Sequence, residues 1–190
     1  MSKSAAIWIN AVAFQLVWIA SVGGAARGLW WAAPLAAGAF AAYELLCGAT
    51  ARADAILILL AMVLGFVADS AVVQAGLADY TSALPSVRFA PLWIVALWAN
   101  FALTLNHSLA WLQGRPWLAA ALGAVGAPLS YFFAAHTWHA LTLTEPLLIT
   151  LGALGAIWAV VTPLLCQIAA RLNRPTGSLD AALAVRGAQP

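Results

Sequence analysis

Apolar residues run almost without interruption through six stretches of this chain, at 5–26, 29–48, 55–77, 91–112, 117–135 and 147–170. A helix needs about 20 mostly apolar residues to cross the hydrocarbon core of a membrane, which is roughly 30 Å thick. Inside lipid, a helix is favoured because it satisfies its own backbone N–H and C=O groups. The sequence therefore predicts an all-α fold, a polytopic membrane bundle of six transmembrane helices.

The overall composition supports this class. Hydrophobic residues make up 65% of the 190 residues and charged residues only 7%, whereas a soluble domain has about 45–50% and about 25%. A soluble monomer is thereby excluded, and membrane lipids are the expected surroundings. The net charge of +2 is too small to indicate a nucleic-acid partner.

The distribution of cationic residues predicts the orientation. With six spans, both termini lie on one side of the membrane, and that side receives six of the eight Lys and Arg residues. By the positive-inside rule both termini are expected in the cytoplasm. An alternative stays open, in which residues 1–26 are a cleaved signal peptide and five spans remain. The six residues are Lys3, Arg52, Arg115, Arg171, Arg174 and Arg186.

Short connections between the spans predict one domain over residues 1–170. Residues 171–190 are more polar and contain Pro175, Gly177 and Pro190. We expect them to form a flexible cytoplasmic tail.

Three ionisable groups fall inside the predicted spans: Glu44, Asp69 and His107. Each costs about 2.5–3.5 kcal/mol to insert on translocon-based scales, so each is a candidate functional residue. The short side chain of Asp69 must face the bundle interior, either as a proton-handling group or as a carboxyl that locks helices together. Glu44 lies near a cytoplasmic helix end, and we interpret it as an interfacial anchor or a partner of Arg52 or Arg115.

The fourth predicted span carries a polar stripe. Asn100, Thr104, His107 and Trp111 follow i, i+4, i+7, i+11 spacing, which places them on one helical face. The stripe is either interhelical glue or one wall of a substrate or proton pocket. Gln15 lies at a similar depth in the first span. The candidate ligand-binding residues are therefore Gln15, Asp69, Asn100, Thr104 and His107.

No motif in the sequence indicates a metal, a cofactor or a nucleophile. His136 and His139 have the spacing of half a zinc site, with Glu145 nearby. No third ligand completes the set, so we predict no metal site. The chain has no nucleophile elbow, phosphate-binding loop or dinucleotide fingerprint. We therefore assign no cofactor and no catalytic residue, and leave open whether the protein is an enzyme.

Several short segments resemble a bacterial family of small polytopic inner-membrane proteins catalogued as a domain of unknown function. The most specific of these segments is Thr104-Leu105-Asn106-His107-Ser108-Leu109. Asp69-Ser70, Phe14-Gln15 and the run 126–131 agree with it. The resemblance covers residues 7–170. It implies a multi-pass protein of the bacterial inner (cytoplasmic) membrane, and it carries over no activity.

Three functional hypotheses follow. The first is an inner-membrane protein with a polar intramembrane pocket that binds or moves a small or lipid-like molecule. In it, Asp69 and His107 handle protons, while Gln15, Asn100 and Thr104 orient the ligand. The second is a structural or accessory subunit without a ligand, and the third a lipid-modifying enzyme with His107 as general acid or base. A protein partner or a homo-oligomer also stays open.

Overall fold

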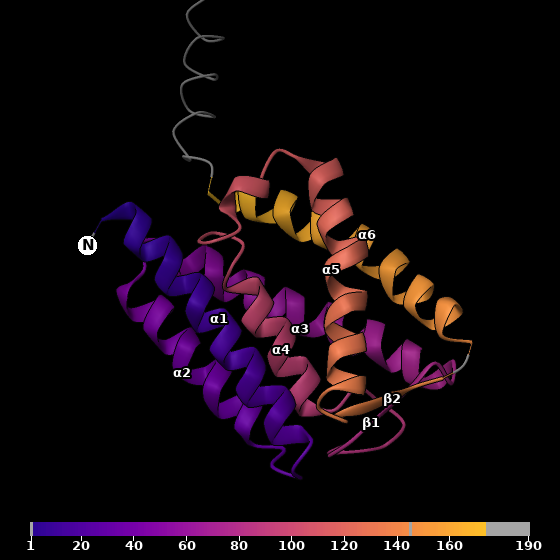
Figure 1. The fold of residues 1–190 in the computed structure, drawn as a ribbon. Helices are drawn as coiled ribbons and strands as arrows, with labels where there is room; N and C mark the ends of the chain where they lie inside the picture. The colour runs from indigo at the N-terminus through magenta and orange to yellow at the C-terminus, as the bar shows by residue number, and fades with distance from the viewer. Residues whose placement is uncertain (1, 145, 174–190) are drawn as a thin grey trace, which may run out of the picture.

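The computed structural model describes residues 2–144 and 146–173, and within them the chain forms six α-helices and one small sheet (Figure 1). The prediction of an all-α fold is confirmed. The tail expected at 171–190 lies outside the described residues from 174 onward. The helices are α1 (Lys3–Ala25), α2 (Ala32–Cys47), α3 (Ala51–Gln74), α4 (Leu92–Ala102), α5 (Pro116–His136) and α6 (Leu147–Leu172).

Four of these helices, α1, α3, α5 and α6, are long and apolar enough to cross a membrane. Their length and composition indicate a membrane protein. The other two are also apolar but shorter, with 16 residues in α2 and 11 in α4. At about 1.5 Å per residue, α4 is far shorter than the hydrocarbon core.

The fourth predicted span differs most from the structure, because α4 ends at Ala102 and residues 103–109 form consecutive turns. A short 3-10 helix, η1 (Ala110–Leu112), follows. Polar side chains in this segment compete with the helix for hydrogen bonds; the hydroxyl of Thr104, for example, donates to the carbonyl of Phe101 at 2.6 Å. The single helical face expected for Asn100, Thr104, His107 and Trp111 therefore does not form.

The connections between helices gather at two ends of the molecule. At one, called the strand end, β1 (Ala78–Tyr80) pairs antiparallel with β2 (Leu141–Leu143). There the hydroxyl of Thr81 donates to the carbonyl of Ala140, in the loop after α5, at 2.6 Å, and the hydroxyl of Ser82 donates to the carbonyl of Ala25, the last residue of α1, at 2.8 Å. At the other, called the histidine end, lie the start of α1, the α2–α3 loop, residues 103–115 and the end of α6 (Figure 1).

Small residues allow a close contact between α5 and α6. A Cβ atom on Gly123 would lie 2.3 Å from the carbonyl oxygen of Trp158, and one on Gly155 would lie 3.0 Å from that of Ala124. Neither approach leaves ordinary room for a larger side chain. Glycine at these positions lets the two backbones pack closely, as is common between membrane helices.

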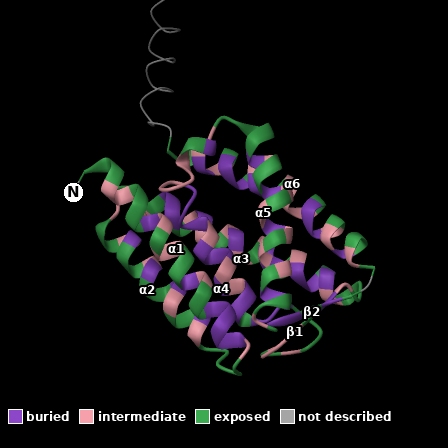
Figure 2. Cartoon of the chain, in the orientation of Figure 1, coloured by how far each residue is buried: buried purple, intermediate pink, exposed green. Residues whose placement is uncertain are grey.

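Large apolar side chains cover the outer surface of the bundle, and the buried residues face inward (Figure 2). Leu46, Trp117 and Leu148 are each more than 80% exposed, at 84%, 88% and 85%. A soluble monomer rarely exposes so much continuous apolar surface. The surface therefore agrees with helices that face lipid.

Candidate functional site

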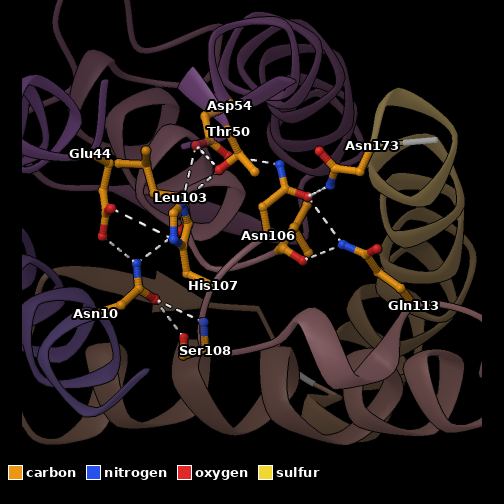
Figure 3. A network of polar contacts seen from close by, with 11 residues as sticks. Asn10, Glu44, Thr50, Asp54, Leu103, Asn106, His107, Ser108, Gln113 and Asn173 are labelled. Carbon is orange, nitrogen blue, oxygen red and sulfur yellow. Dashed lines mark hydrogen bonds and ion pairs between the residues drawn. The ribbon is translucent and has the colours of Figure 1, made fainter. Parts of the chain in front are cut away.

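The polar side chains gather into two separate clusters. The first lies at the histidine end and joins five parts of the chain (Figure 3). We call it the His107 network. Its members are Asn10, Glu44, Thr50, Asp54, Asn106, His107, Ser108, Gln113 and Asn173.

His107 lies between two carboxylates. Its Nε2 atom is 3.1 Å from Oδ2 of Asp54, and its Nδ1 atom is 3.6 Å from Oε2 of Glu44. Burial by itself lowers the pKa of the His107 imidazole, but the hydrogen bond to Asp54 and the negative charges of Asp54 and Glu44 outweigh it. The pKa of His107 is therefore raised above its ordinary value of 6.5. When protonated, the ring can donate from Nε2 to Asp54 and carries a positive charge near the Glu44 carboxylate.

Asp54 has no exposed side-chain surface and is fully hydrogen-bonded. Besides its contact with His107, it accepts from the hydroxyl of Thr50 at 2.8 Å and from the Nδ2 atom of Asn106 at 2.8 Å. Asp54 was not among the predicted site residues because the predicted span begins at 55. A carboxyl in the first turn of an apolar helix, four residues after a Thr, was the available signal.

Asn10 attaches α1 to the rest of the network. Its Nδ2 atom donates to Glu44 at 2.7 Å and to the carbonyl of Leu103 at 3.0 Å. Its Oδ1 atom accepts from the hydroxyl of Ser108 at 2.6 Å. Glu44 is thus buried and bound to Asn10 and His107, and the interpretation of Glu44 as an interfacial anchor is wrong.

The second cluster surrounds Asp69 in the interior of the bundle. Its Oδ1 atom accepts from the hydroxyls of Tyr80 and Tyr131, both at 2.5 Å, and its Oδ2 atom accepts from the indole N–H of Trp98 at 2.6 Å. Burial and the neighbouring Asp69 raise the pKa of Tyr80 well above its usual range, so its hydroxyl stays protonated and donates. Three donors therefore satisfy this buried carboxyl, as buried polar groups require.

A half-enclosed cavity lies beside this cluster, between α1, α4, α5 and α6. Its volume is about 290 Å³, near the lower end of the roughly 300–1,000 Å³ typical of small-molecule sites. Trp98 and Tyr131 line it, so two of the three donors to Asp69 form part of its wall. Its other aromatic residues are Phe14, Trp18, Trp93, Phe101 and Trp158.

A second hollow continues the cavity toward the surface between α1 and α5. Phe14, Trp18 and Ser130 line both spaces, and the second also includes the exposed residues Gln15 and Phe133. The helices α1 and α5 make little direct contact with each other. The interior cavity therefore adjoins the flank of the bundle rather than either end.

The structure does not bring the five predicted ligand-binding residues together. His107 belongs to the network at the histidine end and Asp69 to the interior cluster, whereas Gln15 is exposed beside the second hollow. Asn100 is buried and donates to the carbonyl of Phe14 at 3.1 Å. Thr104 bonds to its own turn.

The three donors to Asp69 were also not predicted. Tyr80, Trp98 and Tyr131 read as ordinary apolar-run or loop residues. The available signal was that a buried carboxyl needs donors, and that buried Tyr and Trp need partners for their O–H and N–H groups. Among the described residues, no group of three or more His, Cys, Asp and Glu side chains is arranged to hold a metal ion.

Residues 7–164 match the family described as protein of unknown function DUF2878, so the chain belongs to this family. The resemblance to a family of unknown function is thereby confirmed. No curated protein and no solved structure shows significant similarity to the chain.

Proposed function

We propose that this DUF2878 protein is a six-pass inner-membrane protein that binds a lipid-like molecule in the cavity between α1, α4, α5 and α6. The observation that carries the proposal is the cavity itself, about 290 Å³ of space with aromatic and aliphatic walls. Proteins rarely leave a space of this size empty, because close packing contributes to stability. An apolar ligand would supply the missing contacts.

Two shorter passes complete the six crossings in this proposal. The second is α2, and the fourth is α4 together with the first turns after it, up to Leu105, so that His107 lies beyond the span. Irregular backbone is tolerated at membrane depth where protein buries it. Leu103 and Leu105 support this, since neither of them has exposed surface.

The charge distribution supports cytoplasmic termini. Among the described residues, Lys3, Arg52, Arg115 and Arg171 belong to segments at the histidine end, and Arg27 and Arg88 to segments at the strand end. The positive-inside rule then assigns the histidine end to the cytoplasm. The raised pKa of His107 would place a proton-holding site at that face.

The second hollow supports entry of the ligand from the bilayer. It leads from the exposed side chains of Gln15 and Phe133 to residues that also line the cavity. A lipid-like molecule would enter sideways between α1 and α5 and need not pass through water. In this proposal Gln15 would contact the ligand where it enters, in the second hollow between α1 and α5.

The cavity can be filled by one substitution. Gly126 lines it, and a Cβ atom there meets nothing within 4 Å, so Gly126→Leu places a side chain in open space. Gly152→Leu on α6 is the matched control, because Gly152 has the same free space and does not line the cavity.

The experiment is native mass spectrometry of each protein released from nanodiscs, followed by analysis of the bound lipids. We expect wild type and Gly152→Leu to carry a lipid-like molecule and Gly126→Leu to lose at least about 90% of it, because overlap with a filled site is not tolerated. Equal occupancy in all three proteins, or an empty wild type, would overturn the proposal.

An accessory subunit without a ligand is the second candidate, favoured by the complete bonding of Asp69. A carboxyl that already accepts from three side chains serves well as a fastener between helices. An empty wild-type protein in the experiment above would favour this function. The enzyme hypothesis has less support, since the hydroxyl of Ser108, next to His107, donates to Asn10 instead of to the imidazole.

A further inference from the structure

One buried hydroxyl beside the cavity has no partner. Within the described part of the chain, two buried side-chain polar atoms lack a hydrogen bond: Oδ1 of Asn100 and Oγ1 of Thr162. Thr162 is only 1% exposed and lines the cavity, whereas Asn100 does not. A buried O–H group without an acceptor is unfavourable, so its acceptor is expected to come from elsewhere.

The Thr162 hydroxyl lies between α5 and α6, next to Gly123. A Cβ atom on Gly123, another residue of the cavity wall, would lie 2.4 Å from Oγ1 of Thr162. Glycine at this position therefore leaves room for the hydroxyl between the two helices. The other hydroxyls of the wall are already used as donors: Ser130 donates to the carbonyl of Gly126 at 2.9 Å, and Tyr131 donates to Asp69.

The charge of the wall limits the ligand further. No Lys, Arg, His, Asp or Glu of the described residues lines the cavity. A phosphate or carboxylate head would have no counter-charge there, and burying an unpaired charge is strongly unfavourable. The ligand that fits is therefore uncharged at the end that the cavity holds.

We infer that the cavity selects a neutral lipid with an acceptor oxygen, a hydroxyl or a carbonyl, and that Thr162 donates its hydrogen bond to that oxygen. This inference rests on the proposed function and names the ligand class of the same site. The aromatic wall receives the hydrocarbon part, and Thr162 fixes the position of the polar part. A site discriminates between ligands with and without an acceptor oxygen when one of its buried donors is hydrogen-bonded only by the ligand that has the oxygen.

The test compares two probes, a bromine-labelled long-chain alcohol and a bromoalkane of the same length. Bromine quenches tryptophan fluorescence, and Trp18, Trp93, Trp98 and Trp158 line the cavity. Quenching of the Gly126→Leu variant in the same nanodiscs measures the background from lipid-facing tryptophans. We expect wild type to bind the alcohol about fivefold more tightly than the alkane, as one net hydrogen bond allows.

Three variants assign the effect. In Thr162→Val, which keeps the shape of the side chain, the preference should fall to about onefold while alkane binding is unchanged. Thr162→Ser should retain the preference. Thr150→Val on α6 is the matched control and should also retain it, because Thr150 does not line the cavity and its hydroxyl donates to the carbonyl of Thr144.

The outcomes separate the two proposals. If wild type binds both probes equally, or if Thr162→Val keeps the preference, this inference is wrong while the cavity remains a binding site. If neither probe quenches wild type above the Gly126→Leu background, the proposed function fails as well. Thermal unfolding without ligand checks folding, and Thr162→Val should be at least as stable as wild type because it removes an unpartnered group.

Discussion

The Nε2 atom of His107 lies 3.1 Å from the Oδ2 atom of Asp54, although 53 residues separate the two along the chain. This contact joins the turns that follow α4 to the first turn of α3. Glu44 faces the other ring nitrogen. The stability of this end of the bundle therefore depends on whether the His107 imidazole is protonated.

The first prediction concerns pH. The folded protein raises the pKa of His107 above 6.5, so the protonated ring contributes stability that is fully present below about 6.5 and is lost as the pH rises through the folded value. The midpoint of thermal unfolding in detergent should fall over that range, by about 2–4 °C for each kcal/mol lost. His107→Gln should remove this slope, and His136→Gln, at an exposed histidine, should keep it. A slope that survives in His107→Gln would contradict the assignment.

The second prediction concerns Asn10. Replacing it by Ala leaves the buried Glu44 without its amide donor and the Ser108 hydroxyl without its acceptor. We expect a loss of about 2–3 kcal/mol in the free energy of unfolding, the range for stranded buried polar groups. Ser4→Ala on the exposed face of α1 should change it by less than about 0.5 kcal/mol. Equal effects of the two substitutions would show that the network contributes little.

The third prediction concerns Asp69. Asn at this position keeps the shape but offers one acceptor oxygen where the carboxyl offers two, so at least one of the three donors loses its bond. Unfolding measurements should show a loss of about 1.5–3 kcal/mol, since hydrogen bonds to charged groups are the stronger ones. The control is Asp79→Asn at an exposed position of β1. A double-mutant cycle with Tyr131→Phe should give a coupling of at least about 0.5 kcal/mol, and an additive result would argue against the bond.

The fourth prediction concerns Gly65, where α3 passes the ring of Trp98. A Cβ atom there would lie 2.1 Å from the Cγ atom of that indole. Gly65→Ala should therefore lower the free energy of unfolding by about 1–3 kcal/mol or prevent folding, because the ring must move away from Asp69. At Gly38 on α2 a Cβ meets nothing within 4 Å, and Gly38→Ala should be neutral or stabilising. Unfolding midpoints in detergent test this prediction, and a Gly65→Ala midpoint equal to or above that of Gly38→Ala would contradict it.

The helices were largely predictable because each long apolar run must satisfy its own backbone hydrogen bonds, and a helix does so. The predicted range 117–135 agrees closely with α5, Pro116–His136. The predicted range 147–170 agrees closely with α6, Leu147–Leu172. The strands β1 and β2 were not predictable, since three residues on each side carry no periodic signal. Their pairing depends on contacts between segments about 60 residues apart, which tertiary structure alone supplies.

The candidate site was predictable in part. Burial of Asp69 followed from the cost of a carboxyl in lipid, and the structure agrees with it. The stripe on the fourth span failed because helical spacing was extended past Ala102, into turns where Thr104 and its neighbours bond locally. The aromatic cavity could not be predicted from the sequence. A cavity depends on the rotation and spacing of the helices, and neither can be deduced from a single sequence.

The residues of the His107 network are synthesised at widely separated times, because they come from distant parts of the chain. Glu44 and Asp54 emerge well before His107, and Asn173, whose amide donates to Asn106 at 2.7 Å, emerges last. Until the later segments arrive, Asp54 lacks both His107 and Asn106, whereas Glu44 lacks only the imidazole because Asn10 precedes it in the chain. The network can therefore close only after the end of α6 has been synthesised.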